Sequence, residues 1–555
     1  MLQTKLVSSL EKCFIDQTPA DFAEVTRVRT YKNVTAAVQL LAYNPDESND
    51  AVVWYTLQVD APEGVEVKLR TVEGIPNYVP TPATPATAME RDSHFLRTTP
   101  GLYPDLLLPL QHHGTVVVVN QQLRTAYIEF TGDLPAGDHN VTIRLVKRNG
   151  EVAVEHVLAL QVIDTCLPEQ DSIVTMWFYA DCLADYYDVE VWSEKHWAIC
   201  ERFARTAVKN GINMLMVPVF TPPLDTAVGQ ERTTTQLVDV TVTNGEYTFG
   251  FEKVDRWMDM LKSCGVKYYE IAHLFTQWGA YHAPKVMATV DGEYKRIFGW
   301  ETEAAGEEYV TFLQAFLAAF TDHLTARGLH DEVYFHISDE PNSDHLAQYK
   351  INRSNVLKVL DGWKIMDALS HLEFYKEGLC EIPVVYSASI HQFMPEDIKE
   401  RWVYYCCGPW VGYSNRFMCM HSARTRYMGT QMYAHGIKGF LHWGYNFFKS
   451  QFSDDENNPF LNANAAYWAG GGDANSVYPG AKGQPLESIR LVAFRQGLED
   501  IRVMKLCEQY YGRDAVMAEI EKVVGKVTFD KCVDDTATMT ALRDRMDDMI
   551  IKAIG

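Results

Sequence analysis

The 555-residue sequence lacks several features that would place it in a common class of protein. No run of about 18 apolar residues is present, so no membrane-spanning helix is expected. Glu11 and Lys12 interrupt the segment in which a signal peptide would be apolar, so export is not expected either. The eleven cysteines are odd in number and show no CxxC spacing, which favours a reducing compartment. We therefore expect a cytoplasmic protein, in which the apolar run around Cys406 and Cys407 forms a packed strand.

Positive charge is scarce as well. Lys and Arg number 50 against 73 Asp and Glu, which gives a formal net charge of -23 and would repel nucleic-acid phosphates. There is no P-loop, no GxSxG motif and no GxGxxG motif that opens a helix. We expect no nucleic-acid partner, no membrane partner and no cofactor, and the sequence leaves a homo-oligomer open.

The composition that is present is typical of a globular protein with more than one domain. Hydrophobic residues make up 47% and charged residues 22% of the sequence. Between residues 26 and 163, short runs such as AVVWYTLQV and HNVTIRLV alternate with turn residues, which predicts an N-terminal β-sandwich at residues 1–167. Within it, VPTPATPATAM at residues 79–89 contains three prolines and is predicted to be a loop.

After Pro168 the pattern changes to apolar runs alternating with amphipathic helices, which predicts a parallel sheet. One such helix is expected to begin at Ser193 and to end at Gly211. Eight runs favour a (β/α)8 barrel at residues 168–485, followed at 486–555 by a barrel-closing helix and a helical cap. The runs are SIVTMWFYA, NMLMVPVF, KYYEIAHLF, EVYFHIS, KIMDALS, PVVYSA, WVYYCC and GFLHWGYNF.

The most informative motif is VYFHISDEPN, in which Asp339 and Glu340 are expected at the end of a barrel strand that Pro341 terminates. Most enzymes that cleave glycosidic bonds use two carboxyl groups, drawn from separate strands and held apart. Adjacent acids fit another scheme better, in which the 2-acetamido oxygen of the sugar is the nucleophile. In that scheme Asp339 orients the acetamide, and Glu340 protonates the leaving oxygen and then activates water.

Strand geometry raises an objection to this hypothesis, because neighbouring side chains of a strand point to opposite faces. A local twist before Pro341 is needed to bring both acids to one site. The simpler alternative is that the two acids belong to a turn and cap the next helix.

Aromatic and polar side chains recur at the other expected strand ends. Each alone is compatible with core packing, but their recurrence favours a sugar site, which needs flat rings and hydrogen-bonding groups. Asp225, after Pro222 and Pro223, either lines this site or stabilises a turn. The candidate substrate-binding residues are Trp177, His273, Trp278, Tyr386, His442, Trp443, Tyr445 and Asn446.

A metal site built from His273, His336 and His442 with Asp339 is an alternative use of the histidines. The sequence has no HxH or HExxH spacing, and neutral imidazoles that bind sugar hydroxyls explain these residues equally well. We therefore expect no metal.

Five motifs together resemble the barrel of glycoside hydrolase family 123 and of the larger, mostly uncharacterised group that shares it. In order they are VPVFTPPLDT, HLFTQWGA, FHISDEP, GFLHWGYNFF and FRQGLEDIRVM, and PGLYPDLLLPL resembles the preceding sandwich domain. The resemblance implies a β-N-acetylgalactosaminidase that acts on terminal residues of glycans, such as those of glycosphingolipids, by the substrate-assisted route. It places the catalytic pair at Asp339 and Glu340. We expect two departures, the lack of a secretion signal and of a separate C-terminal β domain.

Our hypothesis is an exo-acting, retaining glycoside hydrolase that removes terminal β-linked N-acetylhexosamine, with N-acetylgalactosamine preferred. Two alternatives stay open at this point. One is a retaining glycosidase of another specificity with an enzyme nucleophile, for which Glu373 is the nearest candidate. The other is a non-catalytic carbohydrate-binding barrel.

Overall fold

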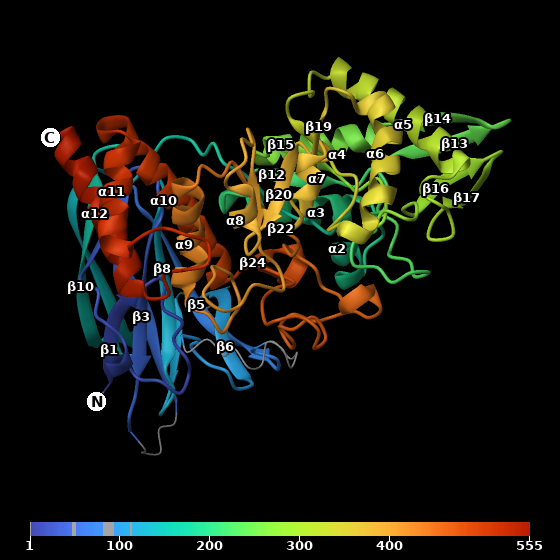
Figure 1. The fold of residues 1–555 in the computed structure, drawn as a ribbon. Helices are drawn as coiled ribbons and strands as arrows, with labels where there is room; N and C mark the ends of the chain where they lie inside the picture. Colours follow the sequence, from blue (N-terminus) through green and yellow to red (C-terminus); the bar gives the residue numbers. More distant parts are fainter. Residues whose placement is uncertain (1, 47–51, 82–93, 111–113) are drawn as a thin grey trace.

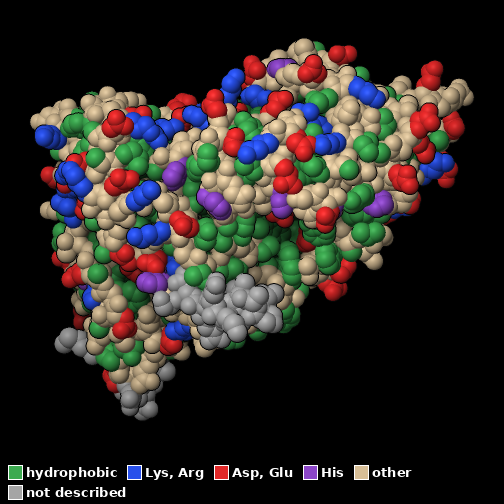
Figure 2. Space-filling model, viewed as in Figure 1, with side chains coloured by type: hydrophobic (Ala, Val, Ile, Leu, Met, Phe, Trp, Pro, Cys, Tyr) green, Lys and Arg blue, Asp and Glu red, His purple; other side chains and the backbone are tan. Residues whose placement is uncertain are grey.

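The computed structural model describes residues 2–46, 52–81, 94–110 and 114–555. The N-terminal sheets and the last helices lie together at one end of the molecule, and the barrel continues from them (Figure 1). Figure 2 shows acidic and basic side chains interspersed over one face, with hydrophobic side chains gathered in a recess near its centre.

The N-terminal region consists of two five-stranded sheets that pack face to face. Alternate residues from Val141 to Leu145 of β9 are buried, namely Val141, Ile143 and Leu145, and they pack in one cluster with residues such as Val38 and Leu40 of β3. The first sheet has the order β1 (Gln3–Ser8), β3 (Ala36–Tyr43), β8 (Arg124–Thr131), β5 (Glu66–Asn77) and β6 (Gly101–Pro109). The second has the order β2 (Arg27–Tyr31), β10 (Val152–Ile163), β9 (Gly137–Lys147), β4 (Val52–Asp60) and β7 (Thr115–Val119).

Eight parallel strands form a closed barrel, and their residues are almost all buried, as expected when both faces of a sheet are covered. The strands are β11 (Ile173–Met176), β12 (Met214–Val217), β15 (Tyr268–Ile271), β18 (Val333–Phe335), β19 (Lys364–Leu369), β20 (Ile382–Tyr386), β21 (Trp402–Tyr404) and β22 (Gly439–His442).

Helices connect the barrel strands on the outside. In α3 the Ser193 side chain accepts the N–H of His196 at 3.3 Å, and Gly211 follows the helix with φ +83°, so the predicted start and end are confirmed. The helices are α2 (Ala180–Tyr186), α3 (Glu194–Lys209), α4 (Glu252–Cys264), α5 (Glu307–Ala326), α6 (Leu346–Leu360), α7 (Glu373–Lys376), α8 (Ile390–Phe393), α9 (Ser422–Ala434) and α10 (Ile489–Tyr511).

A four-stranded sheet between β12 and α5 was not predicted from the sequence. Its order is β14 (Glu246–Gly250), β13 (Asp239–Thr243), β16 (Val286–Val290) and β17 (Glu293–Phe298), and it projects from the barrel (Figure 1). The remaining elements are β23 (Val477–Pro479), β24 (Pro485–Glu487), α11 (Arg513–Val524), α12 (Thr536–Ile554) and four short 3-10 helices, Pro19–Asp21, Ser343–His345, Gln451–Ser453 and Ala481–Gly483.

The end of the chain returns to the N-terminal sheets. Ile489 and Val492 of α10 pack on a cluster from the first sheet that includes Leu107. Fully buried Asp105 of β6 pairs with Arg490 at 2.8 Å, and nearby Arg70 pairs with Glu487 at 2.6 Å. The N-terminal sheets and α10 therefore share both an apolar and an ionic contact.

The predicted β-rich N-terminal region, eight-stranded parallel barrel and C-terminal helices are confirmed. Of the proline-rich loop predicted at residues 79–89, residues 82–89 lie outside the described residues. Among the helices that the structure describes, none is both long and apolar enough to cross a bilayer.

The Arg490→Met substitution tests the ionic contact between the N-terminal sheets and α10. It leaves the Asp105 carboxylate buried without its cation, so we expect the free energy of unfolding to fall by about 3–5 kcal/mol. Urea denaturation measures the change. The control is Arg205→Met, since Arg205 pairs with Glu201 at the surface, and there we expect about 0.5 kcal/mol or less. Equal losses in both variants would contradict the importance of the buried pair.

Candidate active site

Two adjoining cavities lie at the C-terminal ends of the barrel strands, where the active site of such a barrel is expected. The inner cavity has a volume of about 110 Å³, and the outer hollow has a volume of about 810 Å³. Glu340, Tyr404, Cys406, Cys407 and Trp468 line both, whereas Asp339 lines only the inner cavity. Glu340 therefore stands at the junction of the two spaces.

The segment after β18 carries the acid pair. The sequence predicts the two acids at the end of this strand. In the structure β18 ends at Phe335, so the acids lie a few residues beyond it. Glu340 has φ +44°, a left-handed conformation that costs a non-glycine residue roughly 1–2 kcal/mol. This conformation supplies the required twist, because it breaks the alternation of side chains and brings both carboxyl groups to the inner cavity.

Backbone hydrogen bonds hold this strained segment. The Trp278 N–H donates to the Asp339 carbonyl at 3.0 Å, and the Glu340 N–H donates to the Ala368 carbonyl at 3.1 Å. The Asp367 side chain of β19 accepts the N–H groups of Ile337 at 2.9 Å and Ser338 at 3.2 Å. The two neighbouring strands thus fix the path of the chain into the acid pair.

A buried histidine lies between two carboxylates below the pair. His336 contacts Asp367 through Nδ1 at 3.2 Å and Glu270 through Nε2 at 2.6 Å. Burial alone would lower the pKa of His336, but its hydrogen bonds to Asp367 and Glu270 outweigh burial and raise that pKa to about 9. His336 is therefore an imidazolium that donates from both nitrogens at neutral pH.

The acid pair itself holds protons more tightly than usual. Burial and the charge of Glu340 raise the pKa of Asp339 well above its ordinary value. Burial also raises the pKa of Glu340, against a hydrogen bond that the Tyr404 hydroxyl donates to its Oε1 at 2.5 Å. The arrangement can supply one protonated and one ionised carboxyl group side by side, which suits acid/base chemistry.

Four of the eight predicted substrate-binding residues line the cavities. Trp177, Trp278 and Trp443 border the inner cavity, and Tyr386 borders the outer hollow. Trp177 is nearly buried and donates its indole N–H to Glu270 at 2.8 Å, whereas Trp278 is 45% exposed at the rim. Aromatic surface therefore faces the acids from several strands.

The structure does not bring the other four to the cavities. His273 lies below them, stacked on His336 at 4.2 Å, and burial lowers its pKa well below the ordinary value. His442 is buried beside Asp473, at 3.3 Å. Tyr445 donates its hydroxyl to a backbone carbonyl at 2.8 Å, and Asn446 makes two 2.9 Å bonds to the backbone of Tyr179. The chain after β22 turns into the core, so the polar groups of the Tyr445 and Asn446 side chains bond to the protein backbone.

The histidines do not converge on a common centre. Within the described ranges, no group of three or more His, Cys, Asp or Glu side chains is arranged to hold a metal ion.

Several lining residues were missed by the sequence analysis. Cys406 and Cys407 are not packed in a strand, because β21 ends at Tyr404 and the two thiols line both cavities. Tyr404 was not singled out because the predicted strand WVYYCC continued to Cys407, whereas β21 ends at Tyr404. Trp468 had no sequence signal, since it lies in the long connection between β22 and β23.

The N-terminal region reaches the outer hollow through Val79 and Thr81. The side chain of Asn464 accepts the N–H of Tyr78 at 2.7 Å and donates to the carbonyl of Val79 at 2.9 Å. These bonds hold the segment that leads to Trp468 against the residues that directly follow β5.

Comparison with known proteins gives one family. The model of the glycoside hydrolase 123 catalytic domain matches residues 177–507. The structure resembles that of a family 123 glycoside hydrolase from Clostridium perfringens, described for glycolipid glycan hydrolysis, with a TM-score of 0.73 and 14% identity over 100% of this chain and 99% of that one. At this identity the likeness concerns the fold.

Two other solved structures are much less similar. A β-glucuronidase from Parabacteroides merdae has a TM-score of 0.27 and 10% identity, over 80% of this chain and 46% of that one. A putative β-galactosidase from Bacteroides fragilis has a TM-score of 0.29 and 11% identity, over 83% and 56%. No curated protein matches the chain in sequence.

Replacing Asp339 and Glu340 by Asn and Gln tests the electrostatics of the pair. Because their folded-state pKa values are raised, the stability that they contribute is complete below about pH 4 and is lost as pH rises through those values. We expect the double variant to melt above the wild type at pH 8, by about 2 °C or more, and the difference to shrink toward pH 4. The matched control changes another adjacent pair of acids, the exposed Asp454 and Asp455, to Asn. A difference that does not depend on pH would contradict the raised pKa values.

Proposed function

The chain belongs to glycoside hydrolase family 123, and we propose that this glycoside hydrolase removes a terminal β-linked N-acetylhexosamine, preferably N-acetylgalactosamine, from a glycan. The observation that carries the proposal is the placement of two adjacent carboxyl groups, Asp339 and Glu340, in one small cavity. Adjacent acids leave little room for a nucleophile on the opposite side of the sugar, so the acetamide of the substrate takes that part.

The proposed reaction proceeds in two steps. Glu340 donates a proton to the leaving oxygen while the acetamide oxygen attacks the anomeric carbon, and Asp339 accepts the acetamide N–H and stabilises the positive oxazolinium ion. Glu340 then takes a proton from a water molecule that attacks the anomeric carbon. This attack opens the oxazolinium ring and restores the β configuration. This assignment is supported by the lining of the cavities, because Glu340 faces both spaces and Asp339 only the inner one.

The two unequal cavities support exo-action on a longer chain. In this proposal the inner cavity takes one terminal sugar and the outer hollow takes the leaving group. The Clostridium perfringens structure was described for glycolipid glycan hydrolysis, and glycolipid glycans are the substrate class that we propose here as well. The proposal also divides the chain into a β-sandwich domain at 1–167, a catalytic (β/α)8 domain at 168–485 and a helical extension at 486–555.

The structure gives no support to Glu373 as an enzyme nucleophile. Glu373 lies in α7 and accepts a hydrogen bond from the hydroxyl of Ser343. It is not among the residues that line either cavity.

Glu340→Gln tests the acid/base role. Loss of general acid catalysis should lower kcat about 10²–10⁴-fold on chromogenic β-N-acetylgalactosaminide, with the fold retained in circular dichroism. Glu373→Gln is the control and should stay within about twofold of wild type. Undiminished turnover in the Glu340 variant would refute the assignment. The plain β-galactoside is assayed alongside, and its cleavage at a comparable rate would contradict the need for an acetamide.

Two inhibitors separate the mechanisms. We expect a thiazoline that mimics the oxazolinium ion to inhibit competitively, and to bind at least about 10²-fold more tightly than the substrate. A fluorinated glycoside that traps enzyme nucleophiles should leave no adduct in the mass spectrum of the protein. An adduct on any carboxylate would establish the mechanism with an enzyme nucleophile.

A further inference from the structure

Asp225 is a third acid in the inner cavity, and the reaction proposed above gives it no part. It follows Pro222 and Pro223 after β12 and lines the inner cavity but not the outer hollow. Its Oδ2 atom is buried and has no hydrogen-bond partner in the structure. A buried carboxylate oxygen without a donor is costly, which points to a donor that the substrate supplies.

The backbone of Asp225 is held in place by hydrogen bonds at both its N–H and its carbonyl. Its φ is +45°, in the left-handed region. Its N–H donates to Oε1 of Gln277 at 2.5 Å, and its carbonyl accepts the hydroxyl of Ser453 at 2.7 Å. These two hydrogen bonds hold the backbone of Asp225, and with it the carboxyl group, in a defined place.

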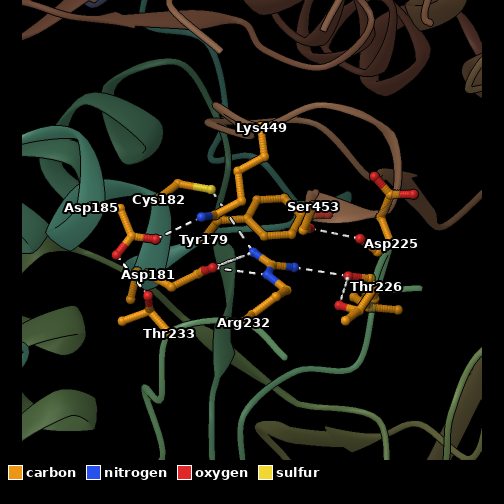
Figure 3. A network of polar contacts seen from close by, with 12 residues as sticks. Tyr179, Asp181, Cys182, Asp185, Asp225, Thr226, Arg232, Thr233, Lys449 and Ser453 are labelled. Atoms are coloured by element: carbon orange, nitrogen blue, oxygen red, sulfur yellow. Dashed lines mark hydrogen bonds and ion pairs between the residues drawn. The ribbon is translucent and has the colours of Figure 1, made fainter. Parts of the chain in front are cut away.

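A buried ionic network lies beside the loop that carries Asp225 (Figure 3). Arg232 pairs with Asp181 through two nitrogens at 2.8 Å and donates to the carbonyl of Leu224 at 2.8 Å. The ring of Tyr179 lies 4.9 Å from the guanidinium. In Figure 3 the Asp225 carboxyl group points away from Arg232, so the cation neutralises Asp181 and fixes the backbone of the loop.

We propose that Asp225 is a specificity-determining residue that accepts hydrogen bonds from hydroxyl groups of the terminal sugar. This inference rests on the proposed function, in which Glu340 and Asp339 serve the anomeric carbon and the acetamide. The hydroxyls at carbons 3, 4 and 6 are then the donors left for Asp225.

The charge of the inner cavity points to a neutral sugar. Asp225, Asp339 and Glu340 all line it, and none of its described lining residues is Lys or Arg. Burial raises the pKa of Asp225 to about 6, so the group is largely ionised at pH 7. A sulfated sugar or a uronic acid would therefore meet negative charge, with no Lys or Arg among these lining residues to offset it.

Deoxy sugars test the role of Asp225. The substrates are chromogenic β-N-acetylgalactosaminide and its 3-, 4- and 6-deoxy analogues. For the wild type, loss of the hydroxyl that Asp225 binds should lower kcat/KM about 10- to 100-fold. In Asp225→Ala and Asp225→Asn this penalty should shrink at least about tenfold, because the parent substrate has already lost the contact. The control is Asp454→Asn, which alters an exposed acid near Asp225 and should keep the full penalty.

The outcomes separate binding from support of the fold. A role in structure alone would slow all four substrates equally, and an undiminished penalty in both Asp225 variants would overturn the proposal. Plain galactoside and glucoside, with their deoxy analogues, complete the panel. If the wild type cleaves only these, the proposed function fails and the Asp225 comparison is made on them. If it cleaves nothing, both proposals are overturned.

Discussion

The hydrogen bonds accepted by the Asp367 carboxylate determine where the acid pair lies. One of its oxygens receives two successive backbone N–H groups, those of Ile337 and Ser338, and also faces the imidazolium of His336. Through Glu270, the same histidine ties β18 to β15. Three strand ends are thus fixed together directly below Asp339 and Glu340, and the left-handed turn at Glu340 can persist because its surroundings hold it.

The treatment of buried charge distinguishes the cavity from the rest of the molecule. Asp181 and Asp105, which are fully buried elsewhere, each face an arginine. The acids of the inner cavity have no such cation among the described lining residues, and their pKa values are raised. Asp181 and Asp105 are thus neutralised by arginines and serve the fold. The acids in the cavity can still exchange protons and accept hydrogen bonds from a ligand.

The barrel could be predicted because its buried strands form apolar runs between amphipathic helices. The four-stranded sheet of β13, β14, β16 and β17 could not be predicted, because strands such as Glu293–Phe298 are largely exposed and polar. In the site, residues at strand ends were found by position, but position does not give direction, so Tyr445 and Asn446 lie in the core. Trp468 had no local signal, since its loop is placed by Asn464 bonding to Tyr78, 386 residues away.

The contact between the first sheet and α10 also bears on the order in which the protein matures during translation. Arg70 and Asp105 leave the ribosome early, but their partners Glu487 and Arg490 are 417 and 385 residues further along the chain. An N-terminal domain ordinarily completes its fold before the next domain is made. Arg70 can already pair with Glu129 of the same sheet, but Asp105 stays without its arginine until nearly the whole polypeptide has been synthesised. The N-terminal region and the barrel therefore reach their final state together.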